Sequence, residues 1–204
     1  MNLERFGGER GAVLADHADR EALDALAAAR GWNRIDARPP GFSELGRQVW
    51  LAGDTAQIVY LESPELGARV VCVVGDEAEP AEEVFAAVTA VLPTVPVDEI
   101  LAGLLAEPMA GPRDLVRGLN RLMAADMPAL ASGGRRPEDP RYRQVVERLA
   151  GHPERQVRRA LLSVAAGMAA VRPELAEPIL ARRDEETELG DLMDAFAEAV
   201  EARR

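Results

Sequence analysis

The sequence contains no lysine, so all 24 of its basic residues are arginines. This absence excludes Schiff-base chemistry, a lysine general base and the lysine of a phosphate-binding loop. Cysteine and histidine are scarce as well, with one Cys and two His. A single cysteine cannot form an intrachain disulfide. Two histidines far apart in the sequence do not supply the four closely spaced ligands that zinc needs. We therefore expect no metal and no cofactor.

Aromatic residues and long apolar runs are also few. Aromatics make up 4% of the chain, although 48% of it is hydrophobic and 29% is charged. The first 14 residues lack the apolar centre of a signal peptide, and no apolar run is long enough to span a bilayer. The net charge of −11 disfavours anionic membranes and unspecific coating of nucleic acid. We expect a cytoplasmic protein that does not bind membranes.

The first half of the chain has the pattern of an antiparallel sheet with flanking helices. A helix is expected from Asp19 to Arg30, with Gly31 as its stop signal. A short strand is expected at Trp32–Arg38, ending at residues 39–41 (PPG). Three clearer strands, separated by connections of hairpin length, are expected at Arg47–Ala52, Gln57–Glu62 and Arg69–Val74. Because Val70–Val74 is apolar throughout, it predicts a strand covered on both faces, with Cys72 buried.

A helix with Val84, Val88 and Leu92 on one face follows, and the segment Pro93–Pro96 breaks it. From Val97 onward the apolar spacing is helical, with about six helices and a loop from Pro128 to Pro140. We therefore predict an α+β fold. Residues 1–93 form a domain with a three- or four-stranded antiparallel β-meander flanked by helices, and residues 94–204 form an array of α-helical hairpins.

The stretch His152–Val171 carries the clearest helical pattern. Its apolar residues recur on one face of a helix, at Val157, Ala160, Leu161, Val164, Ala165 and Met168. Within it, Glu154–Leu161 (ERQVRRAL) resembles the opening of the second helix of HEAT-like repeats, in which a Val-Arg pair precedes small apolar residues. The resemblance implies a HEAT-like scaffold that binds proteins or, in some members, nucleic acid.

Arginine is concentrated just before and within this stretch. Residues 135–159 contain eight arginines and four acidic residues, which leaves the span at +4 and the rest of the chain at −15. This asymmetry is typical of a surface for an anionic partner. The candidate binding residues are Arg141, Arg148, Arg155, Arg158 and Arg159. The alternative is that these arginines pair with local acids, such as Glu154, or face the acidic last helix across a hairpin.

Other features have simpler interpretations. His152, before Pro153, is expected to cap a turn. The acidic run 184–188 is expected at the start of a helix, where negative charge is favourable, and it lacks the spacing of a calcium loop. The aromatic residues Trp32, Trp50 and Tyr60 are expected to pack in a core. We assign no catalytic, cofactor-binding or metal-binding residue.

The sequence therefore predicts a non-enzymatic cytoplasmic protein-interaction module: an adaptor, a regulator or a chaperone-like partner. Its partner is another protein or a second copy of the chain. The alternative is a HEAT-like nucleic-acid-binding protein that places its arginines on phosphates, with binding that falls steeply as salt rises. An acid-dependent hydrolase built on paired carboxylates is a third possibility, for which the sequence nominates no pair.

Overall fold

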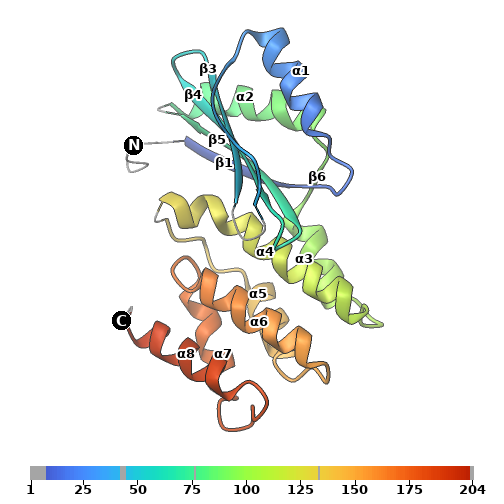
Figure 1. The fold of residues 1–204 in the computed structure, drawn as a ribbon. Helices are drawn as coiled ribbons and strands as arrows, with labels where there is room; N and C mark the ends of the chain where they lie inside the picture. The colour runs from blue at the N-terminus through green and yellow to red at the C-terminus, as the bar shows by residue number, and fades with distance from the viewer. Residues whose placement is uncertain (1–7, 42–44, 76, 133, 203–204) are drawn as a thin grey trace. The chain divides into compact units, whose positions relative to one another are not determined.

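The computed structural model describes residues 8–41, 45–75, 77–132 and 134–202. The chain divides into two compact units, Met1–Val97 and Asp98–Arg204. The first contains an antiparallel sheet with two helices, and the second is helical throughout its regular structure (Figure 1). The α+β fold expected from the sequence is confirmed.

The sheet of the first unit has six strands in the order β2-β3-β4-β5-β1-β6, and every neighbouring pair is antiparallel. The strands are β1 (Gly8–Leu14), β2 (Asn33–Arg38), β3 (Gly46–Ala52), β4 (Ala56–Ser63), β5 (Ala68–Gly75) and β6 (Thr94–Val95). The four strands from β2 to β5 are joined in sequence and form the expected meander.

The expected number of three or four strands is too low, because β1 and β6 also belong to the sheet. Strand β1 pairs with β5, with Gly11 opposite Cys72. Its sequence, GERGAVL, has no alternation of apolar and polar residues that would mark a strand. Strand β6 lies between Pro93 and Pro96, where Val95 pairs with Val13 of β1. The segment that breaks the preceding helix therefore completes the sheet.

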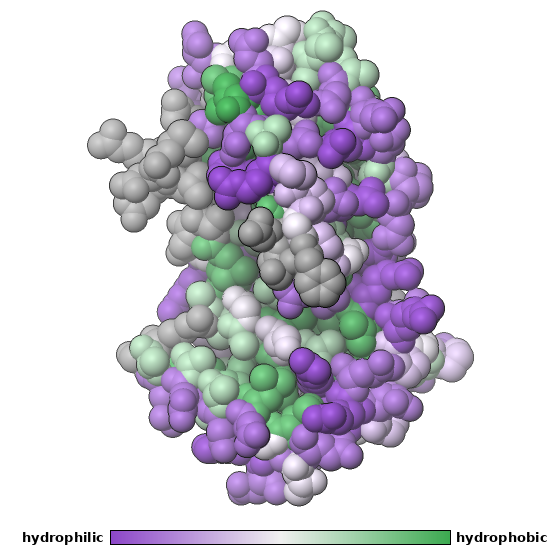
Figure 2. Space-filling view, viewed as in Figure 1, coloured by the Kyte–Doolittle hydropathy of each residue, from purple (hydrophilic) through white to green (hydrophobic). Residues whose placement is uncertain are grey.

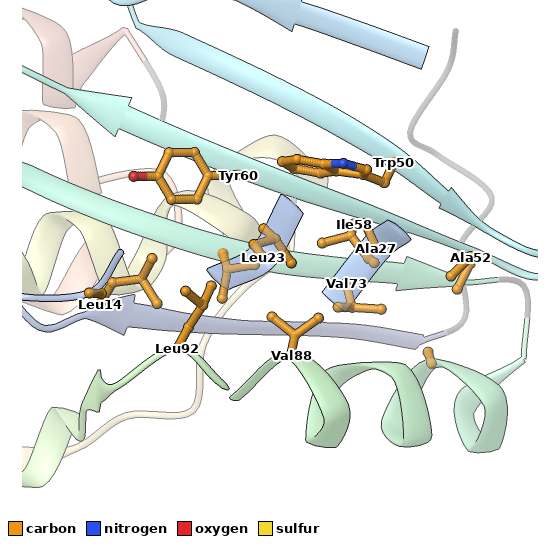
Figure 3. Close-up of a cluster of buried hydrophobic side chains, with 14 residues drawn as sticks. Leu14, Leu23, Ala27, Trp50, Ala52, Ile58, Tyr60, Val73, Val88 and Leu92 are labelled. Carbon is orange, nitrogen blue, oxygen red and sulfur yellow. The ribbon is translucent and has the colours of Figure 1, made fainter. Parts of the chain in front are cut away.

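Two helices, α1 (Arg20–Arg30) and α2 (Ala78–Val91), pack on one face of this sheet. At the start of α1 the Asp19 side chain accepts a hydrogen bond from the backbone N–H of Glu21, and Gly31 ends the helix with φ 67°, as its expected stop. Figure 3 shows the core between the layers, where Trp50 and Ile58 of the sheet meet Leu23 and Val88 of the helices. Trp50 and Tyr60 are buried as predicted, and Trp32 packs at the edge of the cluster.

Strand β5 is buried on both of its faces. Val71 and Val73 point into the core beneath the helices, and Val70 and Cys72, which point the other way, are also buried. The expectation from the uninterrupted apolar run, including a buried cysteine, is confirmed. A strand with this surrounding needs apolar residues at every position, which is why it lacks alternation.

The second unit contains six α-helices and one short 3-10 helix among its described residues. They are α3 (Val97–Leu105), α4 (Pro112–Ser132), α5 (Pro140–Leu149), α6 (Arg155–Met168), the 3-10 helix η1 (Pro173–Leu175), α7 (Ala176–Leu180) and α8 (Gly190–Glu201). Helix α6 packs against α4, α5 and α8. The apolar face predicted for this helix is buried, at Val157, Leu161, Val164, Ala165 and Met168. Whether these helices are HEAT-like repeats stays a prediction.

The expected loop from Pro128 begins too early, because α4 continues through Pro128 to Ser132. A proline inside a helix removes one backbone hydrogen bond and costs roughly 3 kcal/mol. Here its neighbours Ala124 and Ala129 are buried, so tertiary packing holds the helical turn around the proline. The cost of a proline inside a helix can be predicted from the sequence, whereas the tertiary packing that offsets this cost cannot.

Candidate functional site

The five candidate arginines lie on two helices and already have different partners. Arg141 and Arg148 are on α5. Arg141 pairs with Asp139 at 2.6 Å and with Asp98 at 2.7 Å. Arg148 donates to two backbone carbonyls at the C-terminal end of α3, at 3.2 and 2.8 Å, and pairs with Glu107 at 2.7 Å. These two side chains join α5 to the region around α3, so much of their donor capacity is used within the unit.

Arg158 is engaged more completely. Its Nε donates to Glu186 Oε2 at 2.6 Å, and its NH2 group donates to the other oxygen of Glu186 and to the carboxylate of Glu188. Its NH1 group donates to the backbone carbonyls of His152 and Pro153, at 2.8 and 3.0 Å. We call this arrangement the Arg158 clamp. A guanidinium has five N–H groups, and all five are used here.

The clamp gives Glu186 an unusual environment. Burial opposes ionisation of its carboxyl group, but hydrogen bonds from Arg158 and from the backbone N–H groups of Glu188 and Leu189 outweigh it and lower the pKa of Glu186. An ionised Glu186 therefore holds the segment between α7 and α8 against the start of α6. This is the arrangement in which an arginine faces an acidic segment across a hairpin.

Arg155 and Arg159 are the most available of the five. Both are exposed, one turn apart on α6, and both line an open depression of about 460 Å³ beside the start of α8. Arg155 makes one long contact, 3.5 Å from its NH2 group to the carbonyl oxygen of Glu188. Arg159 has no ion pair or hydrogen bond with the part of the chain that the structure describes. The depression also contains Glu188 and Asp191, so its charge is mixed.

A second hollow, about 370 Å³ in volume, lies next to this depression and shares Thr187 and Glu188 with it. We call it the α6 cavity. Its walls are the turn at residues 150–153 and the segment 182–188. Its floor is apolar and consists of Leu161, Leu162, Ile179 and Met193. On the face of the second unit that Figure 2 shows, hydrophobic surface gathers over α6 and is surrounded by hydrophilic residues.

His152 is the buried polar side chain of the α6 cavity. It is only 7% exposed, and its ring lines the cavity. Its Nδ1 accepts a hydrogen bond from the backbone N–H of Glu154 at 3.1 Å, which caps the turn before α6 as expected from the sequence. A ring nitrogen that accepts carries no proton, so the ring proton is on Nε2. Nε2–H has no hydrogen-bond partner among the described residues.

Arg182 lies across the turn at the mouth of the cavity. Its guanidinium rests directly over Gly151, where an added Cβ would come within 2.9 Å of NH1 and NH2. This close approach requires glycine at position 151 unless the arginine moves. The NH2 group pairs with Glu185 at 3.0 Å, and the carboxylate of Glu185 is 67% exposed. The pair is therefore screened by water and weak.

Sequence reasoning missed a deeply buried ion pair of the second unit. Arg172 and Asp126 are 5% and 2% exposed, and Arg172 Nε lies 2.5 Å from Asp126 Oδ2. The guanidinium also donates to the Pro137 carbonyl and stacks 3.6 Å from the centroid of the Tyr142 ring. Burial and the nearby Asp126 charge raise the pKa of Tyr142 to about 12. Each of the two charged residues stands alone in an apolar stretch of the sequence, and this pattern could have indicated a buried ion pair.

The chemistry of the α6 cavity suits binding: an apolar floor with a few oriented hydrogen-bonding groups is typical of ligand sites. Thr187 supplies the only hydroxyl group in the described lining of this cavity. Among the described residues, no cluster of three or more His, Cys, Asp or Glu side chains could hold a metal ion. No helix in the described ranges is both long and apolar enough to cross a membrane. No protein-family model, curated protein or solved structure matches this chain.

Proposed function

We propose that this protein is a non-enzymatic, cytoplasmic protein-interaction module, and that its second unit receives a side chain or chain end of the partner in the α6 cavity. The observation that carries the proposal is the cavity itself. It combines a volume of about 370 Å³ and an apolar floor with walls that the Arg158 clamp holds in place. Partner residues that contribute most to affinity usually enter hollows of this kind, from which water is excluded.

The pairing of the arginines favours this function over binding to nucleic acid. Of the five candidate arginines, Arg141, Arg148 and Arg158 are engaged within the unit, which leaves Arg155 and Arg159 available. Each phosphate that a protein neutralises on duplex DNA contributes a slope of about −0.9 to the dependence of log affinity on log salt. Two arginines would give a slope of only about −2, which is small for a nucleic-acid-binding protein.

The test uses a variant that fills the α6 cavity without disturbing the core. Thr187 is exposed at the cavity wall, and Thr187→Trp would place an indole over the opening. The matched control is Ser163→Trp, because Ser163 is exposed on α6 and does not line the cavity. Tagged wild type and both variants are exposed to an extract of the cells that make the protein, and bound proteins are quantified by mass spectrometry.

We expect a defined partner to be retained by wild type and Ser163→Trp and to be lost from Thr187→Trp. Retention of the same proteins by all three chains would contradict the proposal. Sedimentation of the three purified chains covers the case in which the partner is a second copy. In that case the wild type and Ser163→Trp sediment as oligomers and Thr187→Trp does not.

A further inference from the structure

The polar groups of the α6 cavity are unequally satisfied. Its carboxylates already have donors: Glu186 receives hydrogen bonds from Arg158 and from two backbone N–H groups, and Glu188 receives one from Arg158. Glu185 pairs with Arg182. A ligand that needed to donate hydrogen bonds would therefore compete with strong internal donors.

The donors of the cavity are available instead. The Nε2–H group of His152 has no partner within the described chain, and His152 is more than nine-tenths buried. Arg182 uses only NH2, in its exposed pair with Glu185, so its Nε–H and its NH1 group can also donate. Neither His152 Nε2 nor a guanidinium nitrogen of Arg182 is among the fully buried side-chain atoms that lack a partner in the described chain, so water reaches these donors and a ligand acceptor would take the place of that water. The cavity therefore selects a ligand with hydrogen-bond acceptors.

The charged side chains of the cavity favour a ligand that carries a single negative charge. Glu186 and Glu188 remain at the wall, where they repel a dianion such as a phosphate monoester. Glu185 differs from them, because its carboxylate is 67% exposed and its pair with Arg182 is weak. An incoming carboxylate can take the place of Glu185 on Arg182 while Glu185 turns into solvent. The charge beside Arg182 is then unchanged, so the exchange costs little electrostatic free energy.

The size and the floor of the cavity describe the rest of the ligand. Its volume of about 370 Å³ is at the small end of the range for ligand pockets. Its floor of Leu161, Leu162, Ile179 and Met193 offers only apolar contacts. The matching group is a short aliphatic chain or a single ring attached to the carboxylate.

We propose that the α6 cavity is a carboxylate-binding site, in which His152 Nε2–H and the Arg182 guanidinium hold the carboxylate of a short apolar group and Glu185 occupies the position when no ligand is bound. This inference rests on the proposed function if the carboxylate is the C-terminus of a partner chain that ends in an aliphatic residue. The same chemistry would recognise a free aliphatic acid. The two sources are separated by the experiment.

The chain offers an internal control for the measurement, because it has only two histidines. His152 lines the cavity and His17 is exposed in the first unit. With ¹⁵N-labelled histidine, the two imidazole rings give separate NMR signals. The probes are 4-methylpentanoate, its neutral amide, and a tetrapeptide that ends in leucine with either a free or an amidated C-terminus.

We expect 4-methylpentanoate or the free-acid peptide to shift the Nε2 signal of His152 and to leave that of His17 unchanged. The matching amide should bind roughly tenfold more weakly or worse, since it loses a charge-assisted hydrogen bond. Arg182→Met keeps the aliphatic stem, removes the donor, and should weaken binding of the acid by a similar factor. Glu185→Gln should strengthen it roughly two- to fivefold by removing the competing carboxylate.

Equal affinity for acid and amide, unchanged binding in Arg182→Met, or equal shifts of both histidines would overturn the inference. Thermal unfolding of Arg182→Met and Glu185→Gln verifies that each variant is folded. If the free acid binds and the peptide does not, the ligand is a small molecule. Failure of all four probes while Thr187→Trp still abolishes partner binding would refute the carboxylate site and leave the protein-interaction function standing. If the probes bind but no protein partner is found, the carboxylate site is supported and the protein-interaction function is refuted.

Discussion

Replacing Arg172 by methionine should strongly destabilise the second unit. Methionine fills a similar apolar volume but leaves Asp126, which is 2% exposed, without its two hydrogen bonds at 2.5 and 3.4 Å. The remaining cation near Asp126 is Arg136, at 3.5 Å. Removing one partner of a buried ion pair costs about 3–5 kcal/mol, because the other charge stays buried. The lost stacking on Tyr142 and the lost bond to the Pro137 carbonyl are included in that range, since such terms are not additive.

Urea unfolding followed by circular dichroism at 222 nm measures this effect, because most helices belong to the second unit. At a slope of about 2 kcal/mol per molar urea, the expected loss lowers the midpoint by roughly 1.5–2.5 M. Both tryptophans, Trp32 and Trp50, lie in the first unit, so their fluorescence reports that unit separately.

The double variant Asp126→Leu with Arg172→Met is the control, because it removes both charges. It should be more stable than Arg172→Met alone, since no unpaired charge remains buried. The reasoning is that each of the two buried charges is stabilised by the other. It would be refuted if Arg172→Met lowered the free energy of unfolding by less than about 1 kcal/mol, or if the double variant were less stable than Arg172→Met.

Three further predictions concern ionisation and charge. Because the pKa of Tyr142 is raised to about 12 in the folded protein, its contribution to stability is complete below pH 10 and is lost as the pH rises toward 12. Absorbance at 295 nm should therefore show ionisation of Tyr142 only together with unfolding. Ionisation of Tyr142 near pH 10 in the folded protein would contradict this prediction. The lowered pKa of Glu186 has the opposite effect on the pH dependence: its contribution to stability is present above the ordinary pKa of 4.5 and is lost as the pH falls through the pKa in the folded protein. Glu186→Gln should therefore reduce the loss of stability at acidic pH. An unchanged loss would show that the Arg158 clamp is not its cause. For oligonucleotides, fluorescence anisotropy over a salt series should give weak binding with a slope no steeper than about −2, reduced further in the double variant Arg155→Ala, Arg159→Ala; a much steeper slope would instead favour the nucleic-acid-binding alternative.

Several elements could be predicted from local sequence because their residues interact with near neighbours. Gly31 ends α1 since only glycine adopts φ 67° readily, whatever surrounds it. The apolar run around Cys72 specifies a strand buried on both sides, and the spacing of Val157 and Leu161 specifies the buried face of α6. These signals lie within one turn of helix or one strand, so the sequence contains all of the information.

Other elements depend on partners that are distant along the chain. Strand β1 lacks a strand pattern and is held by β5, about 60 residues later, where Gly11 lies opposite Cys72. Pro128 remains helical only because neighbouring residues of α4 are packed. In both places tertiary contacts outweigh local preference, which a reading of neighbouring residues cannot detect.

The candidate site shows the same division most clearly. The sequence by itself determined the charge pattern: no lysine, an excess of arginine in residues 135–159, and an acidic run at residues 184–188. This run was expected at the start of a helix, but the structure places it before α8, which begins at Gly190. Only the tertiary structure decided which of these charges meet. It brings Arg158 to Glu186 across 28 residues and leaves Arg159 without a partner among the described residues. The physical reason is that pairing energy depends on distance and burial in three dimensions, and composition contains neither.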